Sequence, residues 1–479
     1  MKRRLSLCIS LCTPAAAVLA LSQPAMAATT LPGATMSWPW AVPFFGVLLS
    51  IAAGPLLFPT IWHRHYGKIA GGWAVLTLAA LWIYFGAAAT RAAFVHAVFA
   101  DYLSFILLLF ALYTVAGGIL LEGGIRATPW ANTAMLALGT AMASVIGTTG
   151  AAMVLIRPLI RANSFRPHKT HVVIFFIILV ANVGGALTPL GDPPLFIGFL
   201  RGVDFFWTAQ HLWRQTLIVA ALVLGVFFAV DLWRARHEPA ACEPAVAAPI
   251  RIRGLINLLL IAVIIAAILL SAVWKPGIGF EFNGTRFELQ NLLRDGAMIL
   301  TALASLWLTA DEHRAANGFD WGPMKEVAIL FAAIFIAIIP VIAMLEAGHD
   351  GAFAYILRAV TTPGGRPNDA AYFWLTGGLS AFLDNAPTYL VFFELAGGDA
   401  GQLMGPHAGT LASISMGAVY MGALTYLGNA PNLMVYAIAK DNGIAMPNFF
   451  GYVAWATLIL VPLFVLLTLL PMAPLLTLG

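Results

Sequence analysis

The chain has 479 residues, of which 61% are hydrophobic and 10% charged, and its formal net charge is +4. A soluble domain carries about 25% charged residues, so this composition excludes a water-soluble globular protein. Apolar stretches of about 20 residues recur from Trp40 to Leu470, and each could cross a bilayer. We therefore expect the lipid bilayer as a partner. The chain lacks a basic patch with interleaved aromatic residues, so nucleic acid is not an expected partner.

The N-terminal residues 1–27 have the pattern of a signal peptide. A positive start at Lys2, Arg3 and Arg4 precedes an apolar run, and Ala25-Met26-Ala27 offers a small-x-small cleavage site. The alternative interpretation is an uncleaved first helix. With several membrane spans following, the predicted location is a bacterial-type inner (plasma) membrane.

The rest of the chain divides into two halves. Residues 28–236 contain apolar stretches near 40–61, 69–89, 102–121, 130–160, 171–190 and 215–233. A segment rich in Ala, Pro and Glu, residues 237–252, is predicted to be a cytoplasmic linker. Residues 253–479 contain apolar stretches near 255–273, 295–308, 327–345, 371–395, 408–438 and 452–470. Basic residues flank both ends of one stretch in the first half, which predicts a hairpin near 131–160. The corresponding hairpin in the second half is predicted near 371–397.

The two halves share a sequence motif. Gly185–Pro194 (GALTPLGDPP) aligns with Gly422–Pro431 (GALTYLGNAP). The hairpin interruptions align as well, pairing Thr148 with Asp384 and Thr149 with Asn385. The predicted fold is an all-α polytopic membrane protein with two inverted-topology repeats. Each repeat would contain about five transmembrane helices, some discontinuous, and one re-entrant hairpin.

Broken helices inside a bilayer predict a binding site. Unpaired backbone groups cost several kcal/mol there, so they persist where protein, water or an ion satisfies them. Asp192 and Asp384 lie in these breaks and are candidate functional carboxylates, with helix capping as the alternative for each. The other candidate ligands are hydroxyl and amide side chains: Thr148, Thr149, Asn182, Thr188, Asn385, Thr388, Thr425, Asn429 and Asn432. Asp384, Asn385 and Asp192 are the expected ligands of Na⁺, and no other cofactor is expected.

Other polar residues are expected to face solvent. Arg157 is predicted to extend to the cytoplasmic interface and Glu394 to lie near the outer surface. His63, His65, His168 and His171 are expected to be solvated beside basic loops, and the same basic loops include Lys68 and Arg166.

The motifs Ser380–Thr388 (SAFLDNAPT) and Gly184–Pro194 (GGALTPLGDPP) resemble those of the ion transporter superfamily, which includes arsenite permeases and NhaD-like antiporters. The chain looks closest to the subgroup of citrate transporters and sodium:proton antiporters. This resemblance implies a scaffold part, a transport part that moves like an elevator, and a homodimer.

The hairpin tips favour cation exchange. Relatives that carry carboxylates usually have Ser-Asn-Thr at both tips, whereas this chain has Gly147-Thr148-Thr149-Gly150 and Asp384-Asn385-Ala386. Asp384 would repel a carboxylate, and the breaks contain no Lys or Arg. The main prediction is therefore sodium/proton antiport, and the alternative is sodium- or proton-coupled transport of citrate or another organic anion. A membrane-embedded enzyme is a distant alternative, because neither HExxH nor GxSxG occurs.

Overall fold

The computed structural model describes residues 31–124, 126–238 and 249–469. The predicted signal peptide, residues 1–27, and most of the predicted linker lie outside the described residues. Within the described part, six helices are long and apolar enough to cross a membrane, or up to seven if one bent pair is counted as a span. The predicted fold class, an all-α multi-pass membrane protein, is confirmed. The inverted topology of its halves stays a prediction.

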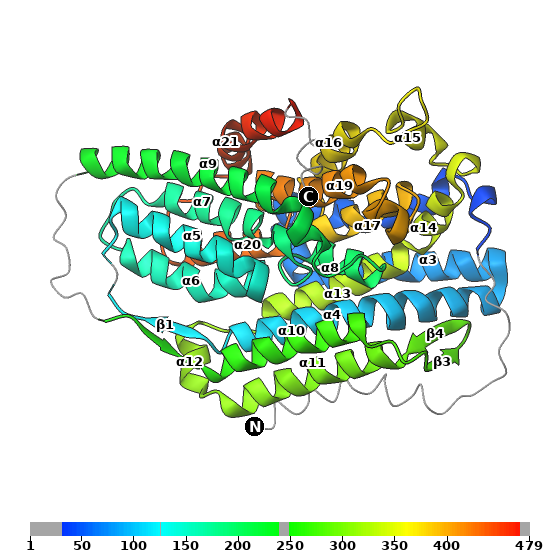
Figure 1. Cartoon of the computed structure of the whole chain (residues 1–479), viewed down its shortest axis with the longest axis horizontal. Coiled ribbons are helices and arrows are strands. Elements are labelled where there is room, and N and C mark those ends of the chain that lie inside the picture. Colours follow the sequence, from blue (N-terminus) through cyan, green and yellow to red (C-terminus); the bar gives the residue numbers. More distant parts are fainter. Residues whose placement is uncertain (1–30, 125, 239–248, 470–479) are drawn as a thin grey trace.

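The helices form two groups that lie against each other (Figure 1). Most of the first group lies in the lower part of Figure 1, where long helices run side by side. Its members are α2 (Val42–Leu57), α3 (Pro59–Val95), the π-helical segment η3 (His96–Tyr102), α4 (Leu103–Ala116), α10 (Ile256–Val273), α11 (Leu289–Leu308) and α13 (Gly322–Ala337).

The second group contains the predicted hairpins and broken helices. From the first half it takes α5 (Pro129–Ile146), α6 (Thr148–Ala162), α7 (Thr170–Leu179), η4 (Val183–Leu187), α8 (Pro193–Leu200) and α9 (Trp207–His237). From the second half it takes α16 (Asp369–Ser380), α17 (Asn385–Leu395), α19 (Ala408–Met421), η6 (Gly422–Leu424), α20 (Ala430–Asp441) and α21 (Phe449–Leu469).

Short elements connect these helices at their ends. They include η1 (Gly33–Thr35), η2 (Trp38–Ala41), α12 (Asp311–Ala316), α14 (Ile339–Glu346), η5 (Gly348–Asp350), α15 (Ala354–Ala359) and α18 (Ala400–Met404). Two small antiparallel sheets pair β1 (Leu120–Glu122) with β2 (Arg251–Arg253) and β3 (Gly279–Phe282) with β4 (Thr285–Glu288).

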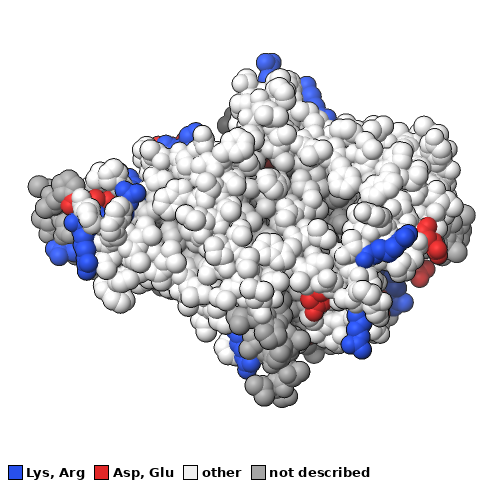
Figure 2. Space-filling view, turned by 90° about the horizontal axis from the view of Figure 1, so that it is seen from above, with Lys and Arg blue, Asp and Glu red and all other residues white. Residues whose placement is uncertain are grey.

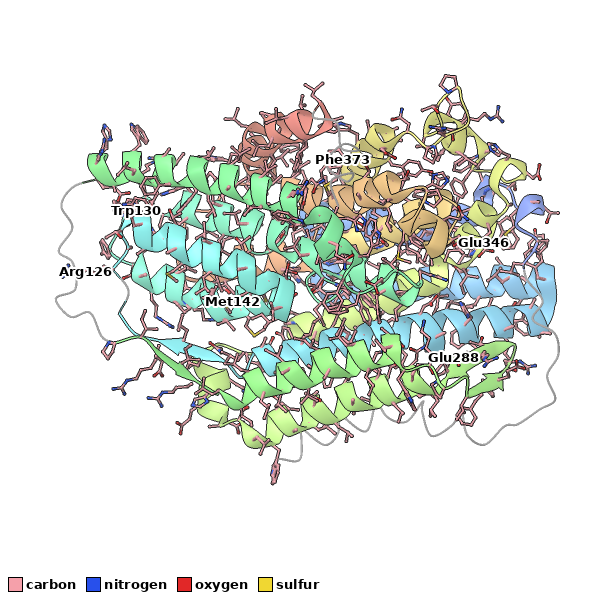
Figure 3. The ribbon with its side chains drawn as sticks, viewed as in Figure 1. Arg126, Trp130, Met142, Glu288, Glu346 and Phe373 are labelled. Atoms are coloured by element: carbon pink, nitrogen blue, oxygen red, sulfur yellow. The ribbon has the colours of Figure 1, made fainter. Side chains whose placement is uncertain are left out.

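The surface agrees with a membrane location. Most of the face in Figure 2 is uncharged, and Lys, Arg, Asp and Glu gather toward its ends and edges. Figure 3 places Arg126 and Trp130 at one end of the molecule and Glu288 and Glu346 at the opposite end. At the end of the molecule that carries Arg126, the Arg161 side chain donates a hydrogen bond of 3.1 Å to the Leu121 carbonyl. This bond joins two segments that are distant in the chain.

The prediction of a loop at His63–Lys68 was wrong. The chain turns at Phe58, between α2 and α3, and these basic residues lie inside α3. Phe58 precedes a proline, and steric clash with the proline ring disfavours helical torsions for the preceding residue. The next interruption is Gly86, whose φ of 80° lies in the left-handed region.

The stretch predicted as one span near 327–345 is bent. Its two helices, α13 and α14, meet at an angle of 41°. Pro340 stands at the beginning of α14, where its missing N–H weakens the continuity of the helix.

Candidate functional site

The interruptions in the second helix group meet at one carboxylate, that of Asp192. Thr148 Oγ1 donates to Oδ1 over 3.1 Å, and Asn429 Nδ2 donates to the same oxygen over 3.1 Å. Asn385 Nδ2 donates to Oδ2 over 2.5 Å. Thr148 and Asn385 begin α6 and α17, whereas Asp192 and Asn429 directly precede α8 and α20. Residues from all four predicted breaks therefore contact one another.

The Asp192 side chain is buried, with 1% of its surface exposed. A buried carboxylate is stable only when its oxygens accept hydrogen bonds or when it meets a positive charge. Here neutral hydroxyl and amide groups supply those bonds, and they come from both halves of the chain. Asp192 makes no side-chain capping bond to α8, so the capping interpretation for this residue is wrong.

Asp384 lies next to this cluster, but its carboxylate makes a different contact. Its carboxylate accepts a hydrogen bond from the Ala386 backbone N–H over 3.2 Å, which caps α17. Thr388 Oγ1 donates to the Asp384 backbone carbonyl over 3.0 Å, and therefore supports the same turn. Capping thus applies to Asp384, although its side chain also lines the cavity described below.

The side chains of Asn182 and Asn432 donate hydrogen bonds to backbone carbonyls that have no helical partner at the breaks. Asn182 Nδ2 donates to the Ile177 carbonyl over 2.8 Å and to Asn432 Oδ1 over 2.7 Å. Asn432 Nδ2 in turn donates to the carbonyls of Gly422 and Thr425 over 2.9 and 3.0 Å. These bonds replace the helical partners that a broken helix lacks.

Two threonines make matching contacts in the two halves. Thr188 Oγ1 donates to the backbone carbonyl of Ser144, and Thr425 Oγ1 donates to that of Ala381, 44 residues earlier in each case. Both bonds join a broken segment to its hairpin. The hydroxyl protons of Thr188 and Thr425 are therefore already donated to backbone carbonyls of the protein.

The predicted pairing of the hairpin tips was wrong by one residue. Gly147 and Asp384 both precede the second helix of their hairpin, and Thr148 and Asn385 both begin it. Thr148 therefore corresponds to Asn385, and each donates to Asp192. The error arose because no residue at the tips is identical between the halves.

A cavity of about 70 Å³ lies between the two helix groups. Thr148, Thr149, Asp192, Asp384 and Asn429 line one side of it. Apolar residues of α4 and α13 line the other side: Phe105, Leu108, Leu109, Leu112, Met324, Val327 and Phe331. None of the described residues that line this cavity is Lys or Arg.

A larger cavity of about 690 Å³, here called the vestibule, adjoins the first one. Asp384 and Asn429 line both cavities. Its outer part is lined by His63, Glu326 and Lys440. This outer part lies at the end of α20, where the Ala445 carbonyl accepts a hydrogen bond from Thr170.

The cluster also contains a buried atom with no partner. Asn385 Oδ1 is inaccessible to solvent and makes no hydrogen bond in the described structure. An unpaired buried acceptor is costly and marks a place where a donor or a cation would be stabilised. The predicted ligand role of Asn385 is consistent with this position but stays a prediction.

Sequence reasoning missed Ser144 and Ser380. Ser144 Oγ donates to the Gly184 carbonyl over 2.5 Å, and Ser380 Oγ donates to the Ala418 carbonyl over 2.6 Å. Each serine lies in the first helix of its hairpin, a few residues before the tip. Their place near the tips in both halves was the signal that could have identified them.

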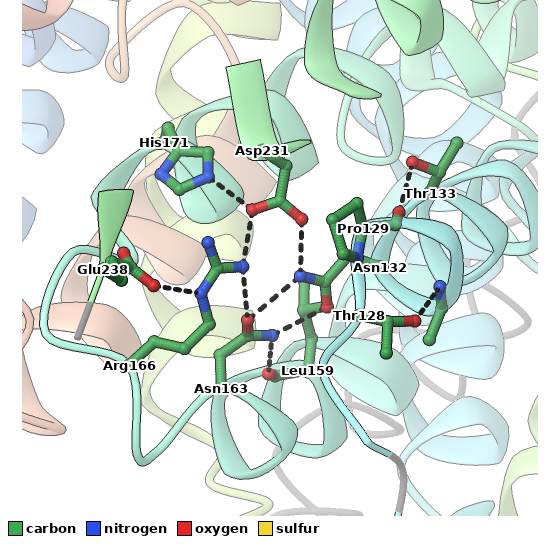
Figure 4. A network of polar contacts seen from close by, with 11 residues as sticks. Thr128, Pro129, Asn132, Thr133, Leu159, Asn163, Arg166, His171, Asp231 and Glu238 are labelled. Atoms are coloured by element: carbon green, nitrogen blue, oxygen red, sulfur yellow. Dashed lines mark hydrogen bonds and ion pairs between the residues drawn. The ribbon is translucent and has the colours of Figure 1, made fainter. Parts of the chain in front are cut away.

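The prediction that His171 faces solvent was wrong, and Arg166 of the same basic loop is buried as well. Figure 4 shows both side chains around the Asp231 carboxylate. Arg166 Nη1 lies 2.5 Å and His171 Nε2 2.8 Å from Asp231 Oδ1, and all three side chains are buried. Asn132 Nδ2 donates to Asp231 Oδ2 over 2.9 Å. A single Asp inside the apolar stretch of α9 was the available signal, because a charge there needs a partner.

The structure also places Glu394 and Arg157. Glu394 was expected near the surface, but 7% of its side chain is exposed and it lies 3.5 Å from Arg201 Nε. Arg157 is partly buried, and its Nη2 donates to the Gly318 carbonyl over 3.4 Å.

The family described as "Putative citrate transport" matches residues 33–472. The chain belongs to this family. The match includes both hairpins and both broken helices, so the whole site lies inside the matched residues. No curated protein matches the chain. Membership of a citrate-transport family, together with the membrane-spanning helices, supports a transporter and favours the alternative prediction over sodium/proton antiport.

Proposed function

We propose that this member of the citrate-transport family is an ion-coupled secondary transporter for citrate or a related organic anion. The observation that carries the proposal is the convergence of all four helix breaks on Asp192, beside a cavity between two helix groups. Discontinuous helices that meet near the middle of a membrane protein are typical of transporter binding sites.

The donors around Asp192 indicate how a carboxylate substrate would bind. Thr148 and Asn429 already donate to one carboxylate, and the positive dipole ends of α6, α8, α17 and α20 lie at the breaks. Similar donors can hold a substrate carboxylate without a cationic side chain.

Coupling to a cation follows from the charge of the site. Asp192 and Asp384 both line the cavity, and an anion that enters it would be repelled unless a cation neutralises them. Na⁺ or H⁺ bound beside Asp384 would remove that repulsion. Binding of the cation would therefore strengthen binding of the anion, which is the requirement for symport.

Alternating access would come from movement of the second helix group against the first. The vestibule opens at the end of the molecule that carries Lys440 and Arg161. Since basic residues concentrate in cytoplasmic loops, we assign this end to the cytoplasm of an inner membrane. This structure then represents a state that is open to the cytoplasm.

Sodium/proton antiport is the second candidate, and the charge of the cavity favours it. Two carboxylates and no described Lys or Arg line the smaller cavity, as a cation exchanger requires.

Purified protein in proteoliposomes distinguishes the two functions. Uptake of radiolabelled citrate that requires an imposed Na⁺ or H⁺ gradient is the result expected for symport. Na⁺-driven proton movement, followed with a trapped pH-sensitive dye in the absence of citrate, is expected for antiport. Proton movement without citrate uptake would overturn the citrate proposal.

A further inference from the structure

Arg201 joins the two helix groups at the side of the site away from the vestibule. Its Nη2 donates to Asp101 Oδ2 over 3.1 Å, and its Nε lies 3.5 Å from Glu394 Oε1. Arg201 directly follows α8 and Glu394 belongs to the last turn of α17, so both are part of the second group. Asp101 lies in η3 and belongs to the first group.

The local structure explains why these charges meet. Arg201 is the residue that ends α8, and a cation is stabilised at the negative C-terminal end of a helix. Glu394 is near the C-terminal end of α17, where a carboxylate is unfavourable without a cation. The π-helical turns of η3 contain Asp101, and such turns frequently occur at functional positions.

The ion pair and the vestibule lie on opposite sides of the central site. Helix α8 begins beside Asp192 and ends at Arg201, and α17 begins beside Asp384 and ends just after Glu394. The ten residues from Asp384 to Glu394 correspond to about 15 Å along the helix. Beyond Arg201 and Asp101 is a cavity of about 220 Å³ that is also lined by Glu346, which lies at the far end from Arg126 (Figure 3).

Apolar packing closes the space between the site and this ion pair. Leu390, on α17, is 2% exposed and lies with Ile197 against Phe331 and Phe335 of α13. The cavity that these residues enclose is about 10 Å³, which holds no substrate. The far side is therefore shut while the vestibule side is open.

We propose that the Arg201–Asp101 ion pair is a latch that holds the far side closed and must separate before the site can open there. The role of this latch rests on the proposed transport function. Its physical basis is that the pair connects the two helix groups and is partly shielded from water, with side chains 21% and 16% exposed. Separation of the groups would break it.

The test uses Asp101→Asn, which removes the attraction across the boundary but leaves Arg201 paired with Glu394. In a chain whose three cysteines are replaced by serine, a Leu390→Cys reporter measures opening of the far side, and an Ala437→Cys reporter measures opening of the vestibule. The probe is a membrane-impermeant maleimide, added to vesicles of each orientation.

We expect the labelling rate at position 390 to rise about 5- to 10-fold in Asp101→Asn and the rate at position 437 to fall. The reason is that a smaller free-energy difference between the two states raises the population of the state that is open on the far side. Arg201→Gln should act in the same direction. The control is Arg358→Gln, which removes an exposed arginine on α15. Unchanged labelling at both positions in correctly folded Asp101→Asn, checked by size-exclusion chromatography, would overturn the latch.

Citrate uptake by the same variants separates this proposal from the proposed function. Shifted labelling in a protein that carries no citrate would support the latch and reject citrate as the substrate. Citrate uptake with unchanged labelling would support the substrate and reject the latch.

Discussion

Asn385 donates a hydrogen bond of 2.5 Å to Asp192, and this bond connects the tip of the second hairpin with the broken helix of the first half. The two residues are 193 positions apart in the chain. Asn385 begins α17, so any displacement of this hairpin must change the environment of the Asp192 carboxylate. A ligand that binds between them would therefore be sensed by both halves of the chain at once.

Asp192→Asn should reduce substrate transport at least tenfold. The amide has the same shape but carries no charge, and its N–H₂ group would face the donors Thr148, Asn385 or Asn429 instead of accepting from them. Initial rates of citrate uptake in proteoliposomes provide the measurement. The control is Asn442→Ala, on an exposed side chain that contacts its own helix. Uptake equal to that of the native protein would contradict a role for Asp192.

Asp384→Asn should remove the dependence on the coupling cation while the protein stays folded. Asn is as good an N-cap as Asp, so the bond to Ala386 N–H is retained and the cost in stability is below about 1 kcal/mol. The measurement is citrate uptake as a function of Na⁺ concentration and pH.

The matched control for this variant is Asp399→Asn, because Asp399 caps α18 through Gly401 and Gln402 N–H groups but lines neither cavity. If both variants keep the native cation dependence, Asp384 has no part in coupling.

Gly191→Ala should prevent folding of the site. A Cβ atom there would lie 2.2 Å from the Gly185 carbonyl oxygen, so the backbone segments around Gly185 and Gly191 would have to separate. Separation would also break the 2.8 Å bond from Thr148 N–H to the Gly191 carbonyl. We expect a lower thermal midpoint in detergent and loss of uptake. Gly225→Ala, where the added Cβ meets no atom within 4 Å, should be neutral. Equal behaviour of the two variants would contradict this packing argument.

Asp231→Ala should destabilise the fold by about 3 kcal/mol, because it leaves the buried Arg166 and His171 side chains without this carboxylate. The cluster lies away from the cavities, so KM for citrate in the surviving folded protein should be unchanged. Thermal unfolding in detergent and uptake kinetics test the two statements. Asp350→Ala, at an exposed position that lines neither cavity, serves as the control. An unaltered midpoint would show that the cluster adds nothing to stability.

Composition and local pattern were sufficient for the class of protein and the places where its helices stop. Apolar stretches must lie in lipid, and Gly or Pro residues interrupt a helix through local sterics alone, as at Gly147 and Pro193. These effects act over a few residues, so they can be read along the chain. The same local reasoning failed at His63–Lys68, because a helix can continue through basic residues once Phe58 has already provided the turn.

Tertiary structure decided the roles of individual polar groups. The sequence placed Asp192 in a broken helix and Asp384 at a hairpin tip and made both of them candidate ligands. Only the packing shows that Asp192 joins the two halves and that Asp384 caps its own helix. Likewise, Arg166 pairs with Asp231, which is 65 residues away in the chain, and Arg201 pairs with Asp101, which is 100 residues away. Such contacts depend on how helices from distant segments pack, and a hydrogen bond requires atoms to be placed within a few tenths of an ångström. The sequence by itself determined a membrane protein with broken helices; the tertiary structure determined which of its polar side chains meet.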